Sequence, residues 1–536
     1  MMNRNRTWIP FVIGLLNMAA ALACGGSNVA GDAGAESGDA GMPDSGVLSD
    51  TGSAADAGAP DSGDGLPDKL PFVFTRADEG APLTPEELTV FTKKVVGFLK
   101  TSDFFNWLVR VSHGMDPSTG YPDYLVWWQD VTPSKAGDTV TFTHHPCCGA
   151  HNTIDITVRF LAQAISGYML TGDPVMAKVA LQYSKGVTAT MKGYIWDTAD
   201  PAPYLMARNI VNKDHAYAVD GGRKKAVVYS TWYNEKDDWN TQRVHFPTNP
   251  TWGDVWVHNM RSKDDVPHIF HVVPLLRYAA ARAPDENVRA AAAEADEWLR
   301  GFARDIVDSG YYIRSKDREG RAYIPTEDLA SFVTYETLDP YAECNAKLNA
   351  ALIGYGEPKG LNCKKGGINA YEETAISIHF YNFDIVASWH VAAILNALVT
   401  GNDKIAEDLL EGLAGRVDKY MNDPDETMSR EPGWKGDLSH YLLRAACAGL
   451  PLTSAEARLI QGQYAAAAEA FSAWEYWDLW DASVPEGNLP YNPGNQGHWI
   501  SIENFAHFLE YCFSPFRNDT GAKVVDCAIV RDPTQW

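Results

Sequence analysis

Apolar positions recur at helical spacing over most of the chain beyond residue 80. In residues 152–171 they lie three and four positions apart, Gly172-Asp173-Pro174 interrupts the pattern, and residues 175–193 resume it. The same order of helix, tight break and helix predicts further pairs at 264–282 with 286–308, 371–399 with 404–421, and 437–449 with 454–473. Single helices are predicted at about 84–100, 102–112 and 500–513.

The two helices of each pair differ in their polarity. The first is apolar on all sides, and the second carries charge along one side. A helix that is apolar all round is buried, and an amphipathic helix covers it. The pattern therefore predicts one all-α domain over residues 69–536, in which outer helices surround inner ones.

Three long stretches rich in Trp, Tyr, Pro and Gly separate the predicted pairs, at residues 113–151, 194–262 and 310–370. We expect loops there, with some β-hairpin content near Ala226–Tyr233. Long loops of this kind usually carry function.

The first 24 residues have the order of an export signal, because two arginines precede an apolar run that ends at Ala23. Two interpretations fit its end. Ala21 and Ala23 suit ordinary secretory cleavage. Cys24 followed by Gly-Gly-Ser resembles the lipobox of bacterial lipoproteins, in which the cysteine is lipidated, although Leu22 stands one place later than is usual there.

Residues 25–68 consist almost only of Gly, Ala, Ser, Asp and Pro, with nine acidic residues and no Lys or Arg. Such a segment buries too little apolar surface to offset its ordering entropy, so it is predicted to be a disordered linker. A linker suits the space between a lipid anchor and a folded domain. It therefore favours an outer-membrane lipoprotein, with simple secretion as the alternative.

The charge balance limits the classes of partner. The chain has 45 Lys and Arg against 69 Asp and Glu, a net charge of −24, of which −17 falls on residues 69–536. An acidic surface disfavours nucleic acid, whose phosphates need basic side chains. The sequence also has no phosphate-binding glycine motif, so no nucleotide cofactor is expected.

The cysteines suit an exported chain, in which disulfides persist. Two pairs flank short loop-like segments and are predicted to be disulfides, Cys344 with Cys363 and Cys512 with Cys527. Cys447 lies in an apolar helical pattern and is predicted to be a buried small side chain.

One histidine- and cysteine-rich segment invites a metal interpretation. His144, Cys147, Cys148 and His151 have side chains that suit zinc or copper. Adjacent cysteines chelate one ion poorly, however, and export favours thiol oxidation. A structural loop is therefore the preferred interpretation, and no cofactor is expected.

The paired helices, the Thr171-Gly172-Asp173 break after an inner helix and the aromatic loops resemble the (α/α)6 toroids of carbohydrate-active enzymes, also called six-hairpin glycosidase-like domains. The likeness covers about residues 80–515 and concerns architecture. Such toroids host glycoside hydrolases, polysaccharide lyases and sugar epimerases. The resemblance implies a cleft where the inner helices begin and a polysaccharide or oligosaccharide as ligand.

Each predicted inner helix opens with an acidic residue near aromatic side chains. Glycoside hydrolysis needs two carboxyl groups, one as acid and one as base or nucleophile. Asp265 and Glu373 are the predicted catalytic pair, with Asp155 and Asp437 as further candidates. The alternative for each single acid is helix capping or a favourable interaction with the helix dipole. The predicted substrate-binding residues are His151, Trp256, His258, Asn259, Arg261, Tyr371, His379, Tyr381, Trp434 and Trp499.

Two other functions remain open. A polysaccharide lyase would use His379 and Tyr381 to remove a proton next to a uronate carboxylate, with Asn259 and Arg261 neutralising the charge. A surface lipoprotein could instead bind glycan or protein without catalysis. Carboxylates from two inner helices lining one cleft would favour an enzyme, and carboxylates paired with arginine would favour binding.

Overall fold

The computed structural model of this chain describes a mostly helical unit that lies within Ala59–Trp536. The described residues are 65–102, 104–112, 131–136, 139–144, 153–207, 209–211, 216–220, 226–231, 243–258, 265–324, 340–363, 380–422, 434–471, 500 and 502–536. The export signal, Cys24 and residues 25–64 of the linker lie outside them. Across these ranges, every helix is too short or too polar to span a bilayer.

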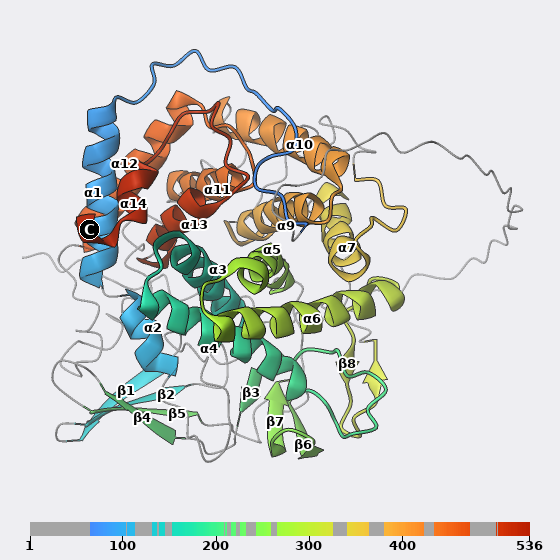
Figure 1. The fold of residues 1–536 in the computed structure, drawn as a ribbon. Coiled ribbons are helices and arrows are strands. Elements are labelled where there is room, and N and C mark those ends of the chain that lie inside the picture. Colours follow the sequence, from blue (N-terminus) through green and yellow to red (C-terminus); the bar gives the residue numbers. More distant parts are fainter. Residues whose placement is uncertain are drawn as a thin grey trace, which may run out of the picture. The chain divides into compact units, whose positions relative to one another are not determined.

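The helices follow the predicted order along the chain (Figure 1). They are α1 (Pro85–Ser102), α2 (Phe104–Ser112), α3 (Thr153–Thr171), α4 (Pro174–Lys192), α5 (Val266–Arg282), α6 (Glu286–Asp308), α9 (Phe380–Val399), α10 (Asp403–Asn422), α11 (Trp434–Cys447), α12 (Ser454–Phe471), the 3-10 helix η7 (Ile502–Ala506) and α13 (His507–Phe513). Residues 371–379 of the predicted inner helix lie outside the described residues.

Among the described residues, the helices that were not predicted are α7 (Pro340–Tyr355), the short α14 (Cys527–Arg531) and the 3-10 helix η8 (Pro533–Gln535). The prediction of a loop over the whole of 310–370 is therefore wrong. Asn345 and Asn349 are both fully buried on α7, so polar residues interrupt the apolar periodicity that marks a core-facing helix.

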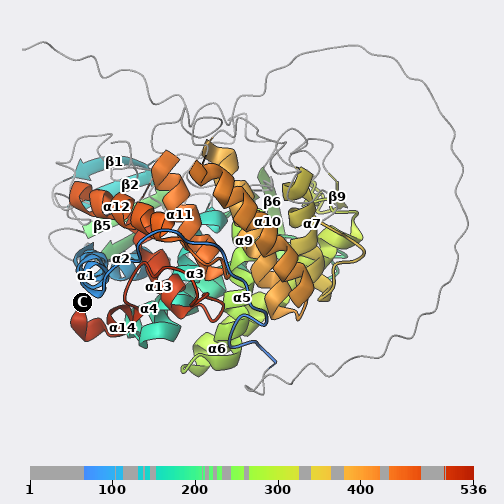
Figure 2. The same cartoon turned by 90° about the horizontal axis from the view of Figure 1, so that it is seen from above.

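The first helix of each pair contacts the first helix of the next pair. α3 packs against α5, α5 against α9, α9 against α11 and α11 against α13, and α13 packs back against α3. We call these five the inner helices. Outer helices cover them, with α4 on α3, α6 on α5, α10 on α9 and α12 on α11, while α7 lies against α6 and α9 (Figures 1 and 2).

Burial confirms the predicted difference between the two helices of a pair. Every residue of α5 from Val266 to Leu276 is buried. Its partner α6 buries one side, including Ala292 and Leu299, and exposes residues such as Glu286. The all-apolar helix is therefore inside and the amphipathic helix outside, as expected from their patterns.

A proline inside α5 is compensated by a neighbouring helix. Pro274 has no N–H, so the carbonyl of Phe270 loses its usual helical donor. Asn396 on α9 donates its side-chain amide to that carbonyl oxygen at 3.1 Å and to the side-chain oxygen of Asn349 at 2.9 Å. Asn396 thus satisfies a buried acceptor that the α5 sequence leaves open.

We expect Asn396→Leu to lower the free energy of unfolding by about 1–3 kcal/mol, because a buried carbonyl would lose its donor. Denaturant unfolding measures the change. Asn287→Leu, at an exposed position of α6, is the control and should stay within about 0.5 kcal/mol of the parent chain. Equal effects of the two substitutions would contradict this role of Asn396.

The long stretches between helix pairs carry the strands, and the predicted hairpin content is present as β4 pairing antiparallel with β5. The strands are β1 (Val131–Ala136), β2 (Thr139–His144), β3 (Asn209–Val211), β4 (Ala216–Asp220), β5 (Ala226–Thr231), β6 (Arg243–Asn249), β7 (Gly253–His258), β8 (Ser315–Lys316) and β9 (Ala322–Tyr323). They form sheets of order β1-β2-β5-β4 and β3-β7-β6, with β8 and β9 as a separate pair.

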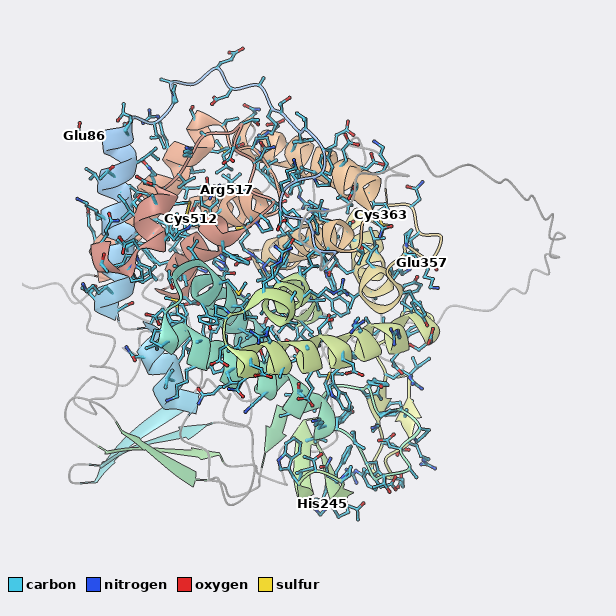
Figure 3. All side chains as sticks on the ribbon, in the orientation of Figure 1. Glu86, His245, Glu357, Cys363, Cys512 and Arg517 are labelled. Atoms are coloured by element: carbon cyan, nitrogen blue, oxygen red, sulfur yellow. A yellow bond between two sulfur atoms is a disulfide. The ribbon has the colours of Figure 1, made fainter. Side chains whose placement is uncertain are left out.

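Both predicted disulfides are confirmed. Cys344 pairs with Cys363 and Cys512 with Cys527, each with Cα atoms 5.3 Å apart. Figure 3 labels Cys512 on α13 and Cys363 after α7. Cys447 is a buried free thiol, also as predicted.

Residues 65–84 form an N-terminal strap that runs from the C-terminal end of α5 to the start of α1 (Figures 1 and 2). Arg282 donates to the carbonyl of Leu66, and the Leu66 side chain is buried. The chain therefore packs on the helices a few residues before position 69, where the folded domain was predicted to begin. Further along, Arg76 donates to Glu456 and to the carbonyl of Pro451. The strap therefore packs where inner helices end, opposite the ends at which the candidate acids lie.

Candidate functional site

The two candidate acids whose side chains are described lie at the starts of adjacent inner helices. Asp155 is in the first turn of α3, and Asp265 is the residue before α5. Asp265 is only 2% exposed, and its side chain makes no capping hydrogen bond. Capping therefore does not explain this acid.

Deeper along α3 and α5 lies an arginine–histidine group. Arg159 donates through Nε to Asp155 Oδ1 at 3.0 Å, and its Nη2 lies 2.6 Å from His268 Nε2. Ser388 Oγ lies 3.5 Å from His268 Nδ1 and accepts from Arg444 Nη1 at 2.8 Å. This chain of contacts joins α3, α5, α9 and α11.

Both neighbours of His268 Nε2 lie on α3. A guanidinium donates and never accepts, so this nitrogen accepts from Arg159. Asp155 Oδ1 lies 3.6 Å from the same nitrogen, and the other ring nitrogen, Nδ1, faces Ser388.

A second cluster, the glutamate–histidine group, surrounds Glu510 on α13. His271 Nε2 lies 2.7 Å from Glu510 Oε1, and His507 Nδ1 lies 3.0 Å from Oε2. Gln163 Nε2 lies 3.3 Å from the other nitrogen of His507 and donates to the carbonyl of Glu503 at 3.0 Å. Burial opposes ionisation of Glu510, but its interactions with His271 and His507 outweigh burial, and the pKa of Glu510 lies well below its usual range.

His440 on α11 belongs to the same group. Its ring packs at a tilt of 34° against that of His507 with centroids 4.6 Å apart, and Asn504 Nδ2 lies 3.2 Å from its Nδ1. Burial lowers the pKa of His440 well below the ordinary value, and positive charge from His507 and Arg444 lowers it further. Burial also lowers the pKa of His507. Both imidazoles are therefore neutral at pH 7.

Three atoms of the glutamate–histidine group are buried without a hydrogen-bond partner among the described residues. They are Gln163 Oε1, His271 Nδ1 and His440 Nε2. Buried polar atoms in proteins are normally paired with protein or water. Each of these atoms therefore keeps an unused hydrogen-bonding position inside the inner helices.

Most of the other predicted site residues are not placed by the structure. His151, Asn259, Arg261, Tyr371, Glu373, His379 and Trp499 lie outside the described residues. Trp256 and His258 are on β7, Tyr381 is on α9, and Trp434 and Asp437 are on α11, with side chains outside the description. Asp437 is the fourth residue of its helix, one turn from where α11 begins.

The proposed metal-binding segment is also largely outside the description. His144 ends β2, and Cys147, Cys148 and His151 follow in undescribed residues. Within the described ranges, no group of three or more His, Cys, Asp or Glu side chains is arranged to hold a metal ion.

Sequence reasoning missed the deeper members of both groups, although a signal was present. Ionisable or histidine residues stand three or four positions apart inside otherwise apolar helices, as in Asp155/Arg159, His268/His271, His440/Arg444 and His507/Glu510. Residues at these spacings share one helix face. A polar pair on a buried face indicates a polar interior.

Comparisons with known proteins give no relative from which a function can be transferred. No protein-family model matches the chain, and no curated protein or solved structure matches it.

Proposed function

We propose that this protein is an exported carbohydrate-active enzyme whose site lies inside the circle of inner helices, towards their N-terminal ends. One observation carries the proposal. Ionisable, histidine, hydroxyl and amide side chains from α3, α5, α9, α11 and the η7–α13 segment meet in these two groups. Buried polar groups of this number are costly for stability alone and are typical of functional sites.

The arrangement that we infer for the helices is an (α/α) toroid. Two features support it, namely the contacts that lead from α3 through α5, α9, α11 and α13 back to α3, and the outer helices that cover the inner ones. In this arrangement the N-terminal strap packs at the ends of the inner helices that are opposite Asp155 and Asp265. A ligand would enter from the end where those acids lie.

Glycoside hydrolysis is the reaction that we assign first, with Asp265 and Glu373 as the pair of carboxyl groups. The support is the burial of Asp265 at a helix start without a capping role. Asp155 is paired with Arg159, so we assign it to substrate binding and keep Asp437 as a further candidate. A carboxylate paired with arginine is also what we expect in the alternative, a non-catalytic lipoprotein that binds glycan or protein.

A polysaccharide lyase is the second candidate, and one observation favours it. Arg159, Arg444 and the Asn504–His440 pair place cations and amide or imidazole donors inside the same circle of helices. Groups of this kind neutralise a uronate carboxylate while a proton is removed beside it. His379 and Tyr381 remain the proposed proton acceptors.

For the location we propose a lipid anchor at Cys24 in the outer membrane, with residues 25–68 as the linker, and simple secretion as the alternative. The composition of the first 68 residues supports this proposal. The net charge of −24 supports a glycan rather than a nucleic acid as partner.

The test is a screen of the full chain on neutral and uronate-containing polysaccharides, with reducing ends and unsaturated uronate products measured separately. We expect Asp265→Asn to lower kcat by about 10²–10⁴-fold, the usual contribution of acid–base catalysis. Asp285→Asn is the matched control, because Asp285 precedes outer helix α6 and its oxygen caps Asn287 and Val288. It should keep full activity.

The possible outcomes separate the proposals. Full activity in Asp265→Asn would contradict the site assignment. Unsaturated products would replace hydrolysis by the lyase reaction. Glycan binding without turnover on any substrate would support the binding protein instead.

A further inference from the structure

The inner helices are joined by one carboxylate, which contacts histidines from two of them. Glu510 is 2% exposed, and its two oxygens face His271 on α5 and His507 on α13. His507 in turn contacts Gln163 on α3 and packs against His440 of α11. Glu510 thus lies at the centre of a contact network that reaches four inner helices.

The chemistry of a carboxylate restricts the protons around it. The pKa of Glu510 is held well below its usual range, so the group is ionised and can only accept hydrogen bonds. The nitrogens that face it, His271 Nε2 and His507 Nδ1, must therefore both carry protons. Burial lowers the pKa of His507, and a neutral imidazole has one proton, which leaves His507 Nε2 as an acceptor.

The neighbouring contacts agree with this pattern. His507 Nε2 faces the amide nitrogen of Gln163, which is a donor and is itself directed by the carbonyl of Glu503. Asn504 Nδ2 faces Nδ1 of His440, so the proton of that neutral imidazole is on Nε2. The group then presents His440 Nε2–H as a donor, and His271 Nδ1 lies on the other side of its ring from Glu510, both atoms buried and without a described protein partner.

We propose that Glu510 is a positioning residue that keeps protons on the two nitrogens that face it, His271 Nε2 and His507 Nδ1, so that the site presents defined donors and acceptors to a polar substrate. This inference rests on the proposed function, because it concerns the same site. Without such a carboxylate, the proton of a buried neutral imidazole could lie on either ring nitrogen. Substrate hydroxyls would then meet different arrangements of donors and acceptors in different molecules.

The charges that face these histidines come from several helices. His507 faces Glu510 on its own helix, Arg444 and His440 on α11, and His271 on α5. His440 faces His507, Arg444, Arg159 on α3 and Glu510. Glu510 is the negative charge that favours protonation of both rings, and the remaining groups oppose it.

The decisive variant is Glu510→Gln, measured by NMR of the full chain labelled with ¹⁵N-histidine. An amide of the same shape offers one acceptor and one donor in place of two acceptors. The ring nitrogen that the amide NH2 group faces must then be without a proton, and where this nitrogen is Nδ1 of His507 its proton moves to Nε2. We also expect the proton affinity of His507 to fall at least about tenfold, because an opposite charge in contact is lost.

Gln163→Leu is the companion variant, and it keeps the test decisive if Glu510→Gln does not fold. It removes the donor that faces His507 Nε2 but leaves Glu510 in place. The proton of His507 should stay on Nδ1. Its transfer to Nε2 would show that Gln163 sets the pattern, and would overturn the proposal.

An activity measurement separates this inference from the proposed function. On any polysaccharide that the chain cleaves, Glu510→Gln should lower kcat/KM and move the acid limb of the pH profile to lower pH. His390→Gln replaces another buried histidine, on α9, and should leave that limb in place. Unchanged proton positions in Glu510→Gln would refute the role of Glu510, whereas absence of activity on every glycan would refute only the proposed function.

Discussion

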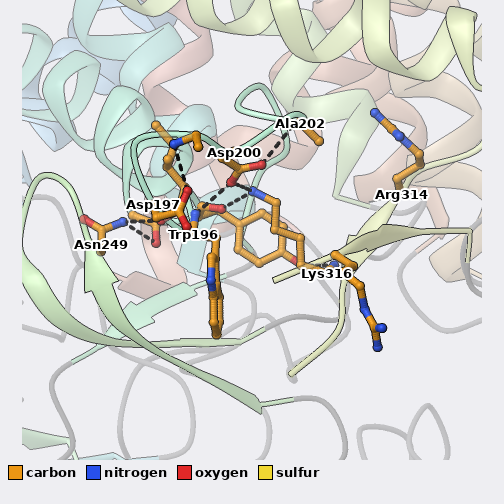
Figure 4. A network of polar contacts seen from close by, with 12 residues as sticks. Trp196, Asp197, Asp200, Ala202, Asn249, Arg314 and Lys316 are labelled. Atoms are coloured by element: carbon orange, nitrogen blue, oxygen red, sulfur yellow. Dashed lines mark hydrogen bonds and ion pairs between the residues drawn. The ribbon is translucent and has the colours of Figure 1, made fainter. Parts of the chain in front are cut away.

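Replacement of Lys316 by Met is expected to lower the free energy of unfolding by about 3–5 kcal/mol, the usual cost of breaking a buried ion pair. Lys316 and Asp200 are bonded to each other with side chains 0% and 1% exposed (Figure 4). The substitution would leave the carboxylate of Asp200 buried without its counter-charge.

The surroundings of this pair explain why both charges are tolerated. Lys316 Nζ also donates to the carbonyl of Tyr194 at 2.5 Å, and Asp200 accepts from the backbone N–H groups of Trp196 and Ala202 at 2.7 and 2.9 Å (Figure 4). Burial lowers the pKa of Lys316, and the bond to Asp200 opposes that effect. The pair thereby fixes β8 to the segment that follows α4.

Chemical denaturation of Lys316→Met and of Lys94→Met compares the loss of a buried ion pair with the loss of an exposed one. Lys94 pairs with Glu469 at 2.6 Å on the surface, so the same substitution there removes an exposed ion pair. Its cost should stay within about 1 kcal/mol. A similar small cost at Lys316 would show that the buried pair contributes no more than a surface pair.

Local pattern was sufficient for the helices and the disulfides but not for the structure of the long connections. α5 and α6 follow from periodicity and from the Ala283-Pro284-Asp285 break, because each signal lies within a few residues. α7 was missed because its buried face carries asparagines. The pairing of Lys316 with Asp200 joins residues 116 positions apart, and a lysine in a loop-like segment is ordinarily read as exposed.

For the candidate site too, local signals were visible in the sequence and contacts between distant residues were not. Asp155 and Asp265 were identified because acids at helix starts are visible in the sequence. The contact between His271 and Glu510 spans 239 positions and exists only because α13 packs back on the first inner helices. The spacing of His507 and Glu510 indicates a polar helix face, but it does not identify His271 as the partner of Glu510.

The second large effect expected is a loss of stability on acidification, caused by buried neutral histidines. Burial lowers the pKa of His390, His440 and His507 below the ordinary 6.5. Below pH 6.5 the unfolded chain therefore binds protons at these positions while the folded chain does not, so stability falls as the pH falls. Each histidine contributes at most about 1.4 kcal/mol per pH unit, or about 4 kcal/mol per unit for all three.

Urea unfolding between pH 7.5 and 5 measures this slope, and single substitutions identify its source. His390→Gln should make the slope shallower by up to about 1.4 kcal/mol per unit, since one proton-binding difference is removed. Asn287→Leu, at an exposed position of α6, removes no titratable group and should leave the slope unchanged. Glu510 causes a separate loss of stability below pH 4.5. Its pKa is lower in the folded chain than in the unfolded chain, so the unfolded chain takes up a proton there first as the pH falls. A flat stability profile from pH 7.5 to 5 would contradict neutral, buried imidazoles, and with them the protonation pattern on which the proposed site depends.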